Sequence, residues 1–66
     1  MNLDEVNSRL AKIHENITDD ERAHSMEDKL HQDVLRSIAD GSCDNPAHCA
    51  AAALASLKLD FARWYA

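Results

Sequence analysis

Two groups of side chains in this sequence could bind a metal ion, and the first lies on a predicted helix. His24, Glu27 and His31 are separated by three and then four residues, so a helix places them on one stripe. Neutral imidazoles and a carboxylate in this arrangement are ligands for zinc or another divalent cation. The stripe also borders the apolar side of the helix, where the commoner outcome is packing at the edge of a core, with Glu27 paired to a His or Arg. We therefore expect no bound metal and keep a metal-binding module as the alternative function.

The same stripe could also respond to pH. An imidazole changes its charge at roughly pH 6.5, within the physiological range. If His24 or His31 lay at a subunit contact beside Glu27, its protonation would bias the association of the subunits.

The second group surrounds a predicted corner. Cys43, His48 and Cys49 supply two sulfur atoms and one imidazole, which are three ligands of a zinc tetrahedron, and Asp44 could supply the fourth. Structural zinc sites usually contain pairs of cysteines with two to four residues between them, and this chain has no such pair. His48 and Cys49 are also adjacent, so on a helix they point about 100° apart. We expect two free thiols with no catalytic role, as is usual for cytoplasmic cysteines.

No pattern of an enzyme is present. The sequence has no glycine-rich phosphate loop, no Ser/His/Asp set and no paired carboxylates in the context of a cleft. A helical chain of 66 residues also offers little concave volume for a substrate. We expect a protein that is not an enzyme and uses no cofactor.

Three helices are predicted, over about 3–16, 19–40 and 46–64. Thr18 and Glu21 form a capping box at the start of the second helix, and Gly41 stands where a left-handed residue would end it. Asn45 precedes Pro46, which favours the start of the third helix. The first helix carries a narrow apolar seam, typical of contact with one neighbouring helix, formed by Leu3, Val6, Leu10, Ile13 and Ile17.

The chain is predicted to be a single small all-α domain. Only one Gly and one Pro are available for turns, which argues against a compact all-β fold. A chain of this size gains barely enough from its core to offset the loss of conformational entropy, so we expect self-association. The expected architecture is an antiparallel three-helix bundle or a helical hairpin that assembles as a homodimer. The candidate interface residues are the seam together with Phe61, Trp64 and Tyr65.

The charge of the chain limits the kinds of partner that it can bind. The formal net charge is −5, and no Lys/Arg cluster is present to neutralise phosphates, so direct binding to nucleic acid or to an anionic membrane is not expected. The longest apolar run, residues 49–55, is too short for a membrane span. The start of the chain does not have the pattern of a signal peptide. These features predict a cytoplasmic protein.

Part of the sequence resembles small proteins encoded by phages of actinobacteria. The resemblance extends over about residues 18–66 and is carried by ERAHSMED at 21–28, LH at 30–31, DVLR at 33–36 and FARWYA at 61–66. That group has no assigned activity, so no functional residue is carried over, and the corner with Cys43 and Cys49 is not part of its pattern. The resemblance implies a phage gene product that is made in a bacterial cytoplasm.

Together these observations favour a small acidic helical module for protein–protein interaction. We expect a homo-oligomer that acts as a phage accessory protein on an unidentified protein of the host or phage. Besides the metal-binding module, a third hypothesis is an acidic mimic of nucleic acid. Its modest charge and interleaved basic residues make the mimic the weakest of the three.

Overall fold

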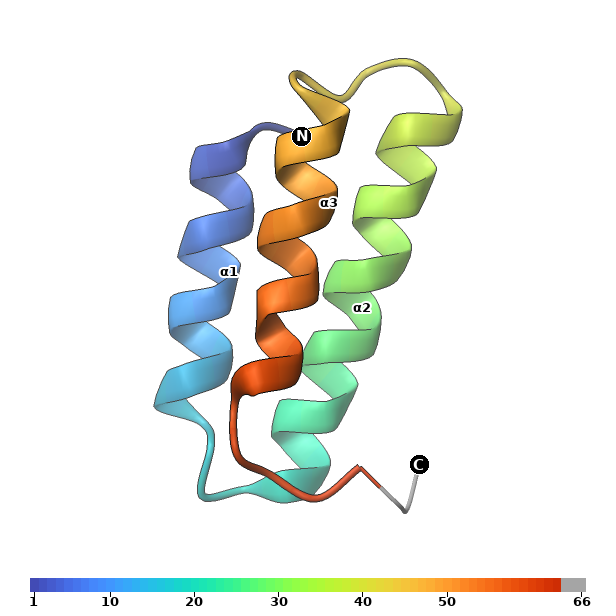
Figure 1. The fold of residues 1–66 in the computed structure, drawn as a ribbon. Helices are drawn as coiled ribbons and strands as arrows, with labels where there is room; N and C mark the ends of the chain where they lie inside the picture. Colours follow the sequence, from blue (N-terminus) through green and yellow to red (C-terminus); the bar gives the residue numbers. More distant parts are fainter. Residues whose placement is uncertain (64–66) are drawn as a thin grey trace.

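The computed structural model describes residues 1–63, and this part of the chain is all-helical, with no strand (Figure 1). Its elements are α1 (Leu3–Glu15), α2 (Asp20–Ala39), α3 (Pro46–Leu54) and the 3₁₀ helix η1 (Ala55–Lys58). The three α-helices lie side by side, and each of them packs against the other two. The prediction of an all-α chain with three α-helices is therefore confirmed for the described residues.

Short polar side chains begin the first two helices. The Asn2 side chain accepts a hydrogen bond from the Glu5 amide at 2.9 Å, and Asp19 accepts one from the Arg22 amide at 3.1 Å. The predicted break between α1 and α2 is confirmed, but the predicted cap of α2 is wrong. Asp19 rather than Thr18 takes the N-cap position, where its carboxylate also interacts favourably with the helix dipole.

The corner between α2 and α3 contains two residues in left-handed backbone conformations. Gly41 follows the end of α2 with φ of +78°, as predicted for this position. Asn45, the N-cap of α3, has φ of +51°, and its side chain makes no capping hydrogen bond. The carbonyl of Ser37 accepts from the amides of Ser42 and Cys43 at 3.0 and 3.1 Å, which closes the last turn of α2.

The third helix is shorter than predicted. The sequence predicts a helix to about residue 64, but α3 ends at Leu54, η1 ends at Lys58, and Leu59 has extended backbone with ψ of 136°. A continuous helix would advance by about 1.5 Å per residue along its own axis and could not turn back after Leu59. The observed turn instead brings Phe61 and Arg63 back against the rest of the chain, where Phe61 is buried.

The core is formed by all three helices and the segment that follows them. Val6 and Ile13 of the predicted seam are fully buried in it, while Leu10 and Ile17 pack against its edge. The seam therefore packs inside this chain and contacts two helices rather than one. The buried apolar residues are Val6, Ile13, Ala23, Leu30, Val34, Cys49, Ala53 and Phe61.

Candidate functional site

The three side chains of the predicted metal stripe on α2 each interact with a different group. Glu27 is only 3% exposed, and its carboxylate is bound by Arg63 through two hydrogen bonds. The distances are 2.8 Å from Nε to Oε1 and 3.1 Å from Nη2 to Oε2. This two-pronged geometry is among the strongest that a carboxylate can have. The expectation that Glu27 pairs with a His or Arg is confirmed.

Arg63 also satisfies backbone groups at the end of η1. Its Nη2 donates to the carbonyls of Ser56 and Leu59 at 2.9 and 3.0 Å, and its Nη1 donates to the carbonyl of Phe61 at 3.3 Å. The guanidinium also lies 3.9 Å from the centre of the Phe61 ring. Arg63 therefore joins the end of the described chain to the middle of α2. The signal in the sequence was a carboxylate within an apolar stripe, which needs a cation, but that signal did not identify which cation.

His31 and Ser56 extend this buried polar network. His31 Nε2 lies 2.9 Å from the Ser56 hydroxyl oxygen and 3.1 Å from the Ala53 carbonyl. The Ser56 hydroxyl in turn donates to Glu27. A His beside a Ser resembles a base and its nucleophile, but Ser56 is 0% exposed and no substrate can reach it. The network fixes η1 against α2 instead.

The environment of Glu27 favours its charged form. Burial by itself raises the pKa of this carboxyl. The hydrogen bonds from Arg63 and Ser56, and the charges of Arg63 and His31, outweigh that effect and hold the pKa below its ordinary value. Glu27 is thus a carboxylate whose negative charge the fold uses.

The remaining candidate ligands do not form a metal site. His24 Nε2 lies 3.5 Å from Asp28 on the same helix. At the corner, His48 is exposed while Cys49 beside it is fully buried, as expected for adjacent residues on a helix. Among residues 1–63, no group of three or more His, Cys, Asp or Glu side chains is placed to hold a metal ion.

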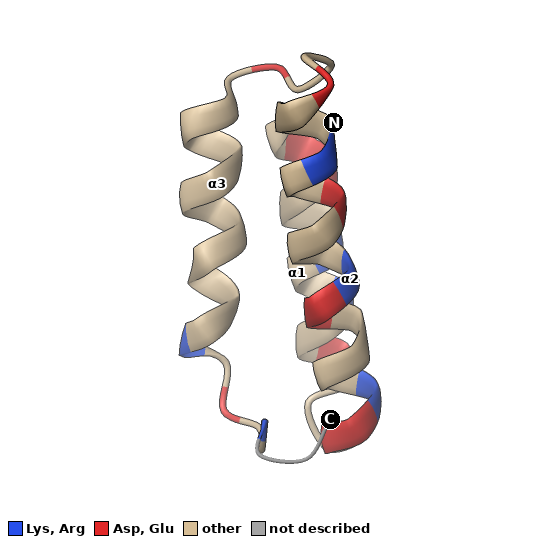
Figure 2. Ribbon diagram, turned by 90° about the vertical axis from the view of Figure 1, so that its right-hand side faces the viewer, with Lys and Arg blue, Asp and Glu red and all other residues tan. Residues whose placement is uncertain are grey.

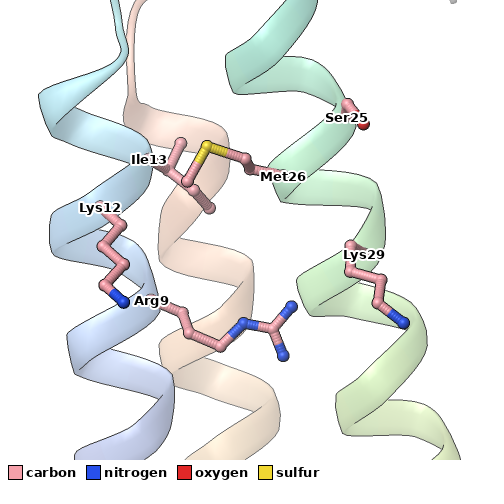
Figure 3. Close-up of a pocket in the computed structure, with 6 residues that line it drawn as sticks. All are labelled: Arg9, Lys12, Ile13, Ser25, Met26 and Lys29. Carbon is pink, nitrogen blue, oxygen red and sulfur yellow. The ribbon is translucent and has the colours of Figure 1, made fainter.

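A groove of about 440 Å³ lies between α1 and α2 (Figure 3). Ile13 and Met26 meet at its apolar part, and Arg9 extends from α1 across the gap. The other lining residues are Lys12, Ser25 and Lys29.

The cations of this groove have an internal counterion. Asp33 accepts from Arg9 at 2.8 Å and lies 3.3 Å from Lys29. The hydrogen bond from Arg9 is the main reason that the pKa of Asp33 lies below its ordinary value. Because two of the three cations already share a carboxylate, the groove is a weak site for an external anion.

The best candidate for a functional surface is the opposite side of α2, where it meets α3. Leu35, Leu54 and Leu57 are 66%, 60% and 55% exposed, and Ile38 is also exposed. Leu35 and Leu54 line one groove of about 250 Å³, together with His31, Val34, Ala50 and Ala53. Ile38 and Leu57 each lie three residues further along, on the same sides of their helices. We call Leu35, Ile38, Leu54 and Leu57 the apolar face.

Charged residues are absent from the α3 side of this face. Residues 46–57 contain no Lys, Arg, Asp or Glu, and Figure 2 shows α3 without charged residues, whereas α1 and α2 carry charges of both signs. Exposed leucines beside an uncharged helix are unusual on a small protein surface, and they are typical of contact sites.

The predicted interface residues have different positions. Phe61 is buried in the core, like Val6 and Ile13, while Leu3 is exposed. Trp64 and Tyr65 lie outside the described residues.

No helix among residues 1–63 combines the length and the apolar character that a membrane crossing requires. No family model, no curated protein and no solved structure matches the sequence.

Proposed function

We propose that this protein is a small protein–protein interaction module that works as a homodimer, in which the apolar face of one copy packs against the same face of a second copy. The observation that carries the proposal is the exposure of three leucines on adjoining helices. Covering an exposed leucine stabilises a contact by about 1–2 kcal/mol. A two-fold contact uses each such residue twice, once on each copy.

The distribution of charge supports a second copy as the occupant. A net charge of −5 makes two copies repel each other wherever their acidic residues approach. Residues 46–57 carry no charged side chain, so a contact centred on α3 keeps the acidic residues of both copies apart. A charged partner would find no complementary charge on this helix.

The size of the face is also suitable. A stable interface takes about 800 Å² from each partner. The accessible surface of this chain is 4333 Å², so such an interface needs roughly a fifth of it. One side of a three-helix protein supplies an area of that order.

The proposal includes the arrangement and setting expected from the sequence. The three helices form an antiparallel bundle as the scaffold of the face. The protein is a phage accessory protein in a bacterial cytoplasm, and the homodimer is the form that meets a protein of the host or phage. No observation on the described residues favours a metal-binding module. Figure 2 shows acidic and basic residues interleaved on α1 and α2, which is a poor imitation of nucleic acid.

Native mass spectrometry of the untagged protein over a dilution series tests the dimer. We expect the wild type to be a dimer that dissociates on dilution and Leu54→Glu to be a monomer. Leu54 is largely exposed, so this variant should keep its helical content. Ala11→Glu, which adds the same charge to an exposed position on α1, is the matched control and should remain a dimer. A wild type that is monomeric at every concentration contradicts the proposal, as does equal dissociation of the two variants.

A further inference from the structure

The two thiols of the corner between α2 and α3 converge on one oxygen atom. Cys43 Sγ donates to the carbonyl of Asp44 at 3.6 Å, and Cys49 Sγ donates to the same carbonyl at 3.2 Å. Cys43 is also one of the neighbours that raise the pKa of the Cys49 thiol, as expected for two side chains that lie near each other. A disulfide brings its sulfur atoms to about 2.05 Å, so oxidation requires both thiols to leave the Asp44 carbonyl and turn towards each other.

We propose that Cys43 and Cys49 form a thiol–disulfide exchange site, at which a low-molecular-weight disulfide oxidises the pair to an intrachain disulfide. This inference does not depend on the dimer. It assigns a function to two residues that the proposed contact leaves unused.

The two cysteines differ in access, which gives them different roles. Cys43 is partly exposed, so a small disulfide can reach its sulfur, whereas Cys49 is fully buried. Burial and the neighbouring Cys43 raise the pKa of the Cys49 thiol, which makes it a poor nucleophile in the reduced protein. Cys43 is therefore the attacking residue, and Cys49 resolves the mixed disulfide.

The reaction takes two exchange steps. The Cys43 thiolate attacks one sulfur of the small disulfide, forms a mixed disulfide and releases one small thiolate. The Cys49 thiol then loses its proton, and its sulfur attacks the Cys43 sulfur and expels the second small thiolate. Two protein thiols are oxidised, one small disulfide is reduced to two thiols, and the two protons from the cysteines end on those thiols.

A disulfide between Cys43 and Cys49 would link the end of α2 covalently to the start of α3, where weaker contacts now hold the two helices. Position 43 follows the end of α2, and position 49 lies in the first turns of α3. Asp44 between them also donates its amide to the Met1 carbonyl at 2.9 Å, so the corner holds the start of the chain as well. A short covalent loop here constrains the unfolded chain, and we expect it to raise the midpoint of thermal unfolding by about 10 °C.

Intact-mass spectrometry of the full chain treated with oxidised glutathione tests the site. The wild type should lose two hydrogen atoms and retain no glutathione, and peptide mapping should link position 43 to position 49. Cys49→Ala should retain one glutathione on Cys43. Cys43→Ser should not react while folded, because Cys49 is buried, and should react in denaturant.

The inference would be overturned if the wild type remained reduced, kept glutathione on Cys43, or formed only disulfides between chains. The measurements on the wild type decide the question even if Cys49→Ala fails to fold.

Discussion

At the scale of single residues, Glu27 has the most unusual environment among the residues described. Its carboxylate is almost fully buried, and it receives hydrogen bonds from Arg63 and Ser56. A buried carboxylate is costly unless its charge and its lone pairs are matched, and here three elements of the chain meet to match them. Breaking this arrangement should be more harmful than removing an exposed charge.

The charge of Glu27 makes the stability of the protein depend on pH. The pKa of this carboxyl is lower in the folded chain than in the unfolded chain. The unfolded state therefore takes up its proton first as the pH falls. The stabilisation by the charge is complete above the ordinary pKa of a glutamate and is lost as the pH falls through the lower value of the folded state.

Glu27→Gln tests this dependence, because it keeps the shape of the side chain and removes the charge. At pH 7 we expect the substitution to lower the free energy of unfolding by about 2 kcal/mol. The wild type loses the same charge at low pH, so the difference between the two proteins should shrink towards pH 3. Urea titrations of both proteins at several pH values measure this difference in the free energy of unfolding.

The control for this experiment is an exposed glutamate. Glu15→Gln at the end of α1 should change stability by less than about 0.5 kcal/mol. A gap between wild type and Glu27→Gln that stays constant from pH 7 to pH 3 would show that packing, and not charge, explains the effect.

At the scale of elements, the N-cap at the start of α2 differs from the one that the sequence predicts. Thr18 and Glu21 have the spacing of a capping box, but the side chain that accepts from the helix is that of Asp19. Asp19→Ala should lower the free energy of unfolding by about 1 kcal/mol. Thr18→Ala, the matched variant one residue earlier, should change it by less than about 0.5 kcal/mol. Urea unfolding of both variants gives the comparison, and the reverse order would restore the predicted capping box.

The ends of the helices show which features a sequence can predict. Gly41 and Pro46 act through their own backbones, so the end of α2 and the start of α3 follow from local chemistry. The end of α3 depends on Arg63 reaching Glu27, which is 36 residues away along the chain. Helical propensity around residues 55–64 carries no information about that contact, so the predicted helix was too long.

The candidate site was harder to predict than the helices. The seam of α1 and the apolar face of α2 and α3 both appear in the sequence as apolar residues at helical spacing. Val6 becomes core because two helices cover it, whereas Leu54 remains exposed because none does. The periodicity of a helix does not state which neighbours it has. The absence of charge from residues 46–57 is visible in the sequence and could have pointed to this part of the chain, but the predicted interface did not make use of it.

At the scale of the whole molecule, the small size of the chain connects folding to association. Among residues 1–63, a core of eight buried apolar residues, several of them as small as Ala and Cys, leaves a narrow margin of stability. A second copy that binds only the folded state adds to that margin in proportion to the logarithm of its concentration. If the apolar face is the contact, the thermal stability of the protein must therefore depend on its own concentration.

Thermal unfolding followed by circular dichroism measures this dependence. For the wild type, we expect each tenfold increase in protein concentration to raise the midpoint by about 4 °C, because the association term adds to the stability of a short chain. Leu54→Glu should unfold at a lower midpoint that does not change with concentration, and Ala11→Glu should follow the wild type. A concentration-independent midpoint in all three proteins would mean that three helices and the Glu27–Arg63 pair hold the fold without a second copy. The exposed leucines would then need a different partner.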